Sequence, residues 1–118
     1  MNGSAPFRIK VLEAVSADET VKTPVPCLGN THFTVYTLSA GTTSSGVLTV
    51  ETASWDPLSQ QDNSATWSSL ATINASDSSA GVYKATVITA GAYDFLRVRI
   101  STVIGGGGTI SAWLVAAP

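Results

Sequence analysis

The sequence has little charge of either sign. Lysine and arginine together number six and aspartate and glutamate eight, which gives a formal net charge of −2 over 118 residues. A nucleic-acid binder normally carries an excess of basic residues, so electrostatic capture of DNA or RNA is not expected. A hydrophobic fraction of 44% also argues against intrinsic disorder, which needs low hydrophobicity and high net charge. We therefore expect one folded domain.

The sequence also has a single cysteine and no long apolar run. Cys27 alone excludes an intramolecular disulfide and a thiolate metal cluster within one chain. No stretch approaches the roughly 20 apolar residues that span a bilayer. The segment Met1–Pro6 lacks the basic start and apolar run of a signal peptide. We expect synthesis in a reducing cytoplasm and no contact with a membrane.

Residues that could carry out catalysis are scarce. His32 is the only histidine, and no acid lies beside it in the sequence to orient its ring, so we interpret it as a polar residue at a strand start. The carboxylates are scattered, and no spacing indicates a glycosidase pair. Asp56, Asp62 and Asn63 offer oxygen ligands for calcium but lack EF-hand spacing. We expect no catalytic residues, no cofactor and no metal site.

What the sequence does contain is a period-two alternation of apolar and polar residues in many short segments. In the clearest segment Leu96, Val98 and Ile100 point one way, and Arg97 and Arg99 point the other. Fifteen serines, fifteen threonines and ten glycines fit short strands joined by polar turns. The predicted strands are Phe7–Val11, Phe33–Leu38, Val47–Ala53, Trp67–Ile73, Gly81–Ile88, Phe95–Thr102 and Thr109–Ala116, with Thr20–Leu28 as a short eighth strand at a sheet edge.

Seven or eight such strands without helices between them predict an all-β fold, an antiparallel β-sandwich. A jelly-roll-like topology and an immunoglobulin-like sandwich both remain open, because the alternation of residues does not choose between them. We expect a flexible N-terminal arm at residues 1–6 and a single domain at residues 7–118. Gly105–Gly108 predicts a hairpin between the last two strands. Ser54–Thr66 is the longest irregular stretch and a candidate functional loop.

Binding residues are suggested by the aromatic and arginine side chains. Trp55 lies in a polar loop, where a tryptophan stacks on a sugar ring or anchors a protein interface. Arg97 and Arg99 share one strand face, which is either solvated or part of a subunit interface. Apolar residues on both sides of some strands, such as Tyr36 and Leu38 behind their neighbours, exceed what a small sandwich can bury. We therefore expect a homo-oligomer or attachment to a larger assembly.

The C-terminal half resembles a known group of proteins. Its residues Trp67–Leu70, Gly81–Tyr83, Tyr93–Ile100 and Gly107–Leu114 follow the progression W-x-x-L, Y/F-x-R-V-R-I and G-G-T-I-x-A. In this the chain resembles the small all-β virion proteins of tailed bacteriophages. Among these it is most like the capsid decoration, or cement, proteins in size and in the lack of catalytic residues.

The resemblance implies a structural role on the capsid surface of a virion. Decoration proteins are compact jelly-roll-like sandwiches, often dimers or trimers, which clamp over joints between major capsid proteins. The residues 1–6 would then order on the shell or on a neighbouring subunit. Our candidate interface residues are Phe7, Trp55, Asp56, Gln60, Asn63, Arg97 and Arg99.

A second hypothesis is a tail or fibre domain or a carbohydrate-binding β-sandwich module. In that case Trp55 would stack on a sugar ring, and Asp56, Gln60 and Asn63 would supply hydrogen bonds to its hydroxyl groups. The residues alone do not separate this hypothesis from the first. The chain length favours the capsid role, because a tail protein is more often one module of a longer chain.

Overall fold

A computed structural model describes residues 5–18, 24–56, 61–62 and 67–118, with only the backbone at residues 55, 56, 61 and 62. The described ranges contain strands and one short 3₁₀ turn but no α-helix, so the all-β prediction is confirmed. The elements are β1 (Phe7–Val15), β2 (Val25–Pro26), β3 (His32–Ala40), β4 (Ser45–Ala53), β5 (Trp55–Asp56), β6 (Gln61–Asp62), β7 (Ser68–Asn74), η2 (Ala75–Asp77), β8 (Tyr83–Ile88), β9 (Phe95–Gly105) and β10 (Thr109–Ala117).

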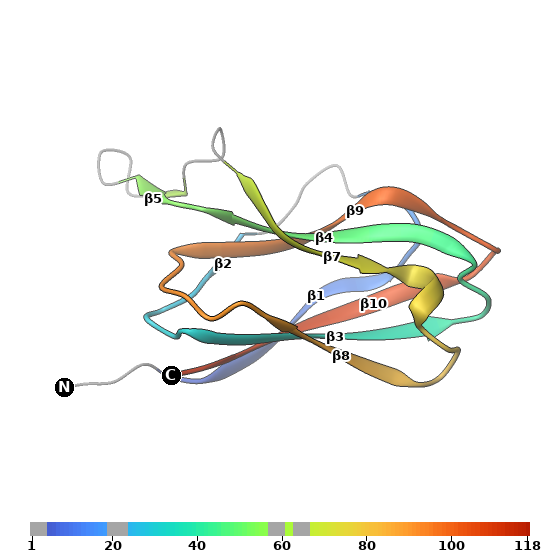
Figure 1. Ribbon diagram of the computed structural model, residues 1–118, viewed down its shortest axis with the longest axis horizontal. Coiled ribbons are helices and arrows are strands. Elements are labelled where there is room, and N and C mark those ends of the chain that lie inside the picture. The colour runs from blue at the N-terminus through green and yellow to red at the C-terminus, as the bar shows by residue number, and fades with distance from the viewer. Residues whose placement is uncertain (1–4, 19–23, 57–60, 63–66) are drawn as a thin grey trace.

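Two four-stranded sheets lie face to face (Figure 1). One has the strand order β1-β10-β3-β8 and the other β2-β9-β4-β7, while β5 and β6 form a small separate hairpin. Neighbouring strands in both sheets are antiparallel. The first strand therefore lies beside the last, which ties the two ends of the domain into one sheet.

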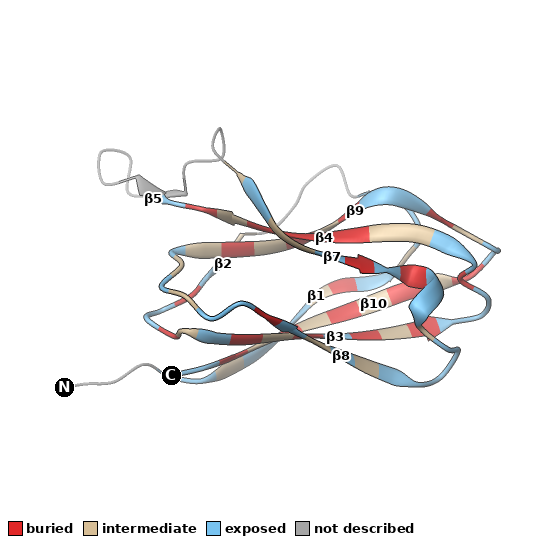
Figure 2. Cartoon of the chain, viewed as in Figure 1, coloured by how far each residue is buried: buried red, intermediate tan, exposed pale blue. Residues whose placement is uncertain are grey.

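The core lies between the two sheets and follows the alternation in the sequence. In β10 the side chains of Ile110 and Leu114 are fully buried, whereas that of Trp113 between them is on the outer face. Figure 2 shows the resulting change of burial along each strand. The other large and fully buried side chains come from both sheets and include Phe33, Val35, Leu48, Val50, Ile88, Leu96 and Ile100.

Several element boundaries differ from the prediction. β1 continues to Val15, four residues beyond its predicted end, because two register shifts against β10 interrupt the alternation after Lys10. Such bulges turn two successive side chains to one face, so a period-two pattern does not detect the strand beyond them. The stretch predicted as irregular, Ser54–Thr66, contains the short pair β5 and β6. The proline-containing β2 does lie at a sheet edge, as predicted.

The predicted hairpin at Gly105–Gly108 is wrong. β9 and β10 belong to different sheets, so the glycines cross from one layer to the other. They lie against a second crossing, between β3 and β4, where the Gly108 N–H donates to the Thr42 carbonyl at 2.7 Å. A Cβ atom on Gly106 would come within 2.8 Å of that same carbonyl oxygen. Glycine is needed here because two backbones approach each other closely, and not because the chain folds back within one sheet.

The start of the domain is held by a buried asparagine. The Asn30 side-chain amide donates to the carbonyl of Ala5 at 2.9 Å and to that of Cys27 at 3.0 Å. Ala5 and Pro6 precede β1, so this contact fixes the end of the predicted N-terminal arm to the domain. The remainder of that arm, residues 1–4, lies outside the described residues, and its flexibility stays a prediction.

Candidate interaction surface

The two arginines predicted as interface residues lie on the outer face of the sheet β2-β9-β4-β7. The Arg97 Nε atom is 2.7 Å from Glu51 Oε1, and Arg99 is 2.9 Å from Asp18 and 3.6 Å from Glu51. The Arg97 guanidinium also lies 4.2 Å from the centre of the Trp67 ring, within cation–π range. Both arginines thus have partners within the chain, and their contact with another protein stays a prediction.

Among the other interface candidates, Phe7 is the only one whose side chain lies in the described part of the chain. Phe7 begins β1 and packs, half-buried, against the core. Trp55 and Asp56 form β5, but their side chains lie outside the description. Gln60 and Asn63 lie outside the described residues altogether. Arg97 and Arg99 are therefore brought together by β9, while the Trp55 platform stays a prediction.

Within the described ranges, the surroundings of the only histidine and the only cysteine offer no arrangement for nucleophilic chemistry. His32 is exposed, and its Nδ1 atom is 3.0 Å from both the Thr31 hydroxyl and the carbonyl of Pro118. Cys27 is fully buried, and burial, together with the negative charge of Asp94, raises the pKa of its thiol to about 12. Among the described residues no three acidic, histidine or cysteine side chains gather to hold a metal ion.

The outer face of the other sheet, β1-β10-β3-β8, is aromatic and was not recognised from the sequence. The strand register places Tyr36 beside Trp113 on one side and beside Ala85 on the other. The rings of Tyr83 and Trp113 lie 5.5 Å apart at an angle of 56°. Tyr83 is 60% exposed and Val87 79% exposed, so this face leaves large apolar side chains in contact with water.

This aromatic face, which we define as the outward residues Tyr36, Tyr83, Val87, Trp113 and Val115 with Arg8 at its edge, contains a hollow. The hollow has a volume of about 420 Å³ and is lined by Arg8, Tyr36, Tyr83 and Trp113. The Lys10 ammonium lies 5.0 Å from the centre of the Trp113 ring. The hollow thus combines aromatic rings with basic groups from β1.

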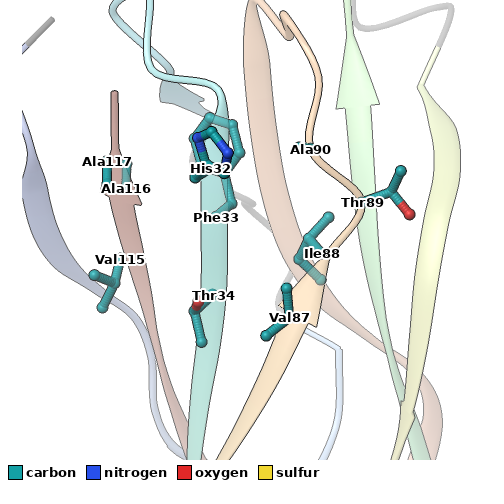
Figure 3. A pocket seen from close by; sticks show the side chains of 10 residues that line it. All are labelled: His32, Phe33, Thr34, Val87, Ile88, Thr89, Ala90, Val115, Ala116 and Ala117. Carbon is teal, nitrogen blue, oxygen red and sulfur yellow. The ribbon is translucent and has the colours of Figure 1, made fainter.

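A second hollow lies at the end of the same sheet where β3 begins, at His32, and β10 ends, at Ala117. It has a volume of about 520 Å³. Figure 3 shows that its lining comes from β3, from β10 and from β8 with the segment that follows β8. The two hollows share no lining residue, but they are close in the sheet, because Arg8 of the first hollow is the register partner of Val115 of the second.

Comparison with known proteins finds similarity in the fold alone. No protein-family model matches the chain, and no curated protein matches it. Among the solved structures that resemble it are two phage-derived proteins. One is the SPBc2 prophage-derived protein YomS, with a TM-score of 0.57 and 9% identity over 99% of this chain and 97% of YomS. The other is the PBSX exported protein XepA, with a TM-score of 0.60 and 17% identity over 98% of this chain and 39% of XepA.

These two similarities cover almost the whole chain, so they concern the complete two-sheet arrangement and not one hairpin of it. YomS is matched over nearly its full length, whereas this chain spans about two fifths of XepA. At such low identity the likeness shows a shared fold and carries no residue roles from one protein to another. No helix in the described ranges is long and apolar enough to cross a membrane.

Proposed function

We propose that this protein is a structural component of a bacteriophage particle. The observation that carries the proposal is the fold likeness of the whole chain to YomS, a prophage-derived protein. The sequence resemblance of the C-terminal half to small β-rich virion proteins supports the same assignment. The protein acts through binding and has no enzymatic activity. It therefore contributes a stable surface to the particle and not a reaction.

Within the particle we assign it the role of a capsid decoration protein that binds the major capsid protein. A protein that binds the assembled shell and not its free subunits stabilises the shell by the free energy of binding. The surface that faces the shell is the sheet β2-β9-β4-β7 with the adjoining hairpin of β5 and β6, which lie on the same side of the molecule (Figure 1). This side carries Trp55, Arg97 and Arg99.

We also propose that the protein is a homo-oligomer, a dimer or a trimer, on the shell. Its low charge gives weak repulsion between copies. Several copies joined together would bind several capsid joints at once, and the second contact would form at a high effective concentration. This avidity gives firm attachment although each single contact is weak.

For the topology we propose a jelly roll in preference to an immunoglobulin-like sandwich. The chain changes sheet at almost every connection, and β4 and β7 are consecutive long strands that share one sheet. The first and last strands lie side by side. An eight-stranded pair of sheets with such connections is the jelly-roll pattern of many capsid domains, whereas an immunoglobulin sandwich keeps its first two strands in one sheet.

Co-sedimentation with expanded phage shells tests the proposed function. The protein is expected to sediment with assembled shells at a fixed ratio to the capsid protein, and to leave free capsid subunits unbound. It is also expected to raise the temperature at which the shells fall apart. Failure to bind any expanded shell at micromolar concentration would contradict the proposal.

A carbohydrate-binding or tail-fibre module is the second candidate. The observation in its favour is the hollow between Tyr36, Tyr83, Trp113 and Arg8, because aromatic faces stack on sugar rings. This hollow lies on the sheet opposite to Trp55, which was the residue proposed for sugar stacking from the sequence. Binding to a glycan array without binding to shells would favour this second candidate.

A further inference from the structure

The hollow on the aromatic face has the size of a small-ligand site. Its volume of about 420 Å³ falls within the range of roughly 300 to 1,000 Å³ that such sites occupy. The rings of Tyr83 and Trp113 meet at 56° and so form a corner instead of a flat platform. A corner of this kind holds a ring-shaped ligand by its face and its edge together.

The polar groups around the hollow are available to a ligand. Within the described part of the chain, Arg8 takes part in no ion pair and no hydrogen bond. The hydroxyl groups of Tyr36 and Tyr83 and the indole N–H of Trp113 likewise have no hydrogen-bond partner among the described residues. None of these atoms belongs to the buried polar atoms that lack a partner, so a ligand in the hollow can form hydrogen bonds with them.

The charge of the hollow favours an anion. β3, β8 and β10, which supply most of this face, carry no aspartate or glutamate. Lys10 is already paired with Glu13, so its charge is compensated within β1. Arg8 therefore provides an uncompensated positive charge beside three aromatic rings. A guanidinium group binds a carboxylate through two parallel hydrogen bonds, which a single ammonium cannot form.

A second copy of the chain is a poor occupant of this face. The aromatic face spans four strands and about five residues along them, which is about 15 Å by 15 Å at strand spacings of ~4.8 Å and a rise of ~3.3 Å per residue. This is about 225 Å², and a stable protein interface buries about 800 Å² on each partner. The face is thus far smaller than a dimer interface and matches a compact ligand.

We infer that the hollow between Arg8, Tyr36, Tyr83 and Trp113 binds a sugar ring that carries a carboxylate, such as a hexuronic acid. The C–H face of the sugar lies against an aromatic ring, and its carboxylate accepts two hydrogen bonds from Arg8. The tyrosine hydroxyls bond to the hydroxyl groups of the sugar. The inference goes beyond the capsid role, because this sheet faces away from the side assigned to the shell.

Titration with D-glucuronate, followed through the indole ¹H–¹⁵N resonances, tests this inference. The Trp113 resonance, identified from a Trp113→Phe variant, is expected to shift with saturation and a dissociation constant of about 1 mM, a normal affinity for a ligand of this size. D-glucose is expected to bind at least tenfold more weakly because it lacks the carboxylate. Acetate is expected to give no saturable shift because it lacks the ring.

Matched variants separate the charge from general effects on folding. Arg8→Gln is expected to remove the preference for glucuronate over glucose, and Tyr83→Ala to weaken both. Lys84→Gln is the control, because it also removes one positive charge. Lys84 is paired with Asp77 and does not line the hollow, so this variant is expected to leave binding unchanged. Absence of any Trp113 shift with glucuronate at tens of millimolar, or equal binding by wild type and Arg8→Gln, would overturn the inference.

A tetrasaccharide of alternating glucuronate and N-acetylglucosamine distinguishes a polymer from a free sugar. Tighter binding of the tetrasaccharide, with shifts at Val87 and Val115 in the neighbouring hollow, assigns a surface polysaccharide as the ligand. Binding of the single sugar alone assigns a free acid. An acidic peptide that competes more strongly than either sugar would instead assign a protein partner and contradict the proposal. Shell co-sedimentation is unaffected by all of these outcomes, so failure of one proposal is distinguishable from failure of the other.

Discussion

At the scale of single residues, the cysteine gives a clear pH dependence. The thiol of Cys27 is fully buried, and its pKa rises from 9.0 to about 12 because burial disfavours the thiolate. An acid whose pKa is raised by folding stabilises the native state fully below its unfolded pKa. That stabilisation is lost as the pH rises from about 9 towards 12, because the unfolded chain then releases a proton that the folded chain keeps.

We therefore predict that the free energy of unfolding falls by about 1.6 kcal/mol between pH 9.0 and pH 10.5 through Cys27 alone, with a slope that rises towards about 1.4 kcal/mol per pH unit as the unfolded thiol becomes fully ionised. A Cys27→Ala variant loses this contribution to the slope and serves as the reference for other groups that titrate in the same range. Urea unfolding at both pH values measures it. Equal slopes for wild type and variant, or rapid reaction of the native thiol with a disulfide reagent at pH 8, would show that Cys27 is not enclosed.

A second residue-scale prediction concerns the turn at Cys27–Asn30. Leu28 and Gly29 have φ values of 55° and 80°, and the Asn30 N–H donates to the Cys27 carbonyl at 3.0 Å. Positive φ at both central residues is the type I′ pattern, which favours Asn-Gly. Leu28 is 62% exposed, so its replacement costs little buried surface. Leu28→Asn is expected to stabilise the protein by about 0.5–1 kcal/mol.

Thermal unfolding measures this gain, and Val82→Asn is the control. Val82 is also well exposed, at 57%, but it is not among the described residues with positive φ. Its replacement is therefore expected to give no increase in Tm. A lower Tm for Leu28→Asn than for wild type would mean that the Leu28 side chain stabilises the fold through contacts that its exposure does not reveal.

At the scale of elements, the two chain crossings at one end of the sandwich depend on each other. Gly106 and Gly107 both have positive φ values, 102° and 87°. A Cβ atom on Gly106 would lie 2.8 Å from the Thr42 carbonyl oxygen, while one on Gly107 would meet nothing within 4 Å. Substitution of Gly107 therefore tests backbone strain alone, whereas substitution of Gly106 tests backbone strain together with steric crowding between the crossings.

We predict that Gly107→Ala costs about 1–2 kcal/mol, the strain of a left-handed alanine. Gly106→Ala is expected to cost about 1–3 kcal/mol more, because the crossing at Thr42 must also move away. Denaturant unfolding of the two variants measures the difference. If the two variants lost the same free energy of unfolding, or if Gly107→Ala lost more than Gly106→Ala, the close approach of the two crossings would be contradicted.

The same crossings show what alternation along a sequence does and does not specify. It identified the strands and their inward residues, such as Leu96 and Leu114, because burial on one face imposes period two. It could not show that β9 and β10 lie in different sheets, since the glycines between them fit a hairpin and a crossing equally well. Which strands pair is decided by contacts between residues far apart in the chain.

At the scale of the whole molecule, the candidate sites divide between two opposite faces. The sequence singled out Arg97 and Arg99, because a period of two is enough to place them on one face. It did not show their ion pairs with Glu51, because these depend on the pairing of β4 with β9. It missed the aromatic face, because Tyr36, Tyr83 and Trp113 come together only when β3 lies between β8 and β10.

This division gives the protein two outer faces of different character. The sheet β2-β9-β4-β7 has a charged outer face whose arginines are paired within the chain, and it carries the hairpin that begins at Trp55. The opposite sheet has an aromatic outer face with a hollow and an uncompensated Arg8. In our proposals the first face binds the capsid shell and the second binds an acidic sugar, and on these proposals one small sandwich would join a particle to a ligand outside it.

A cryo-electron microscopy map of expanded shells with and without the protein tests this account most directly. We predict extra density of sandwich shape over the joints between capsid subunits, with Trp55 and the sheet β2-β9-β4-β7 against the shell and Tyr83 facing outwards. Absence of extra density, or density in which the aromatic sheet lies against the shell, would contradict the account.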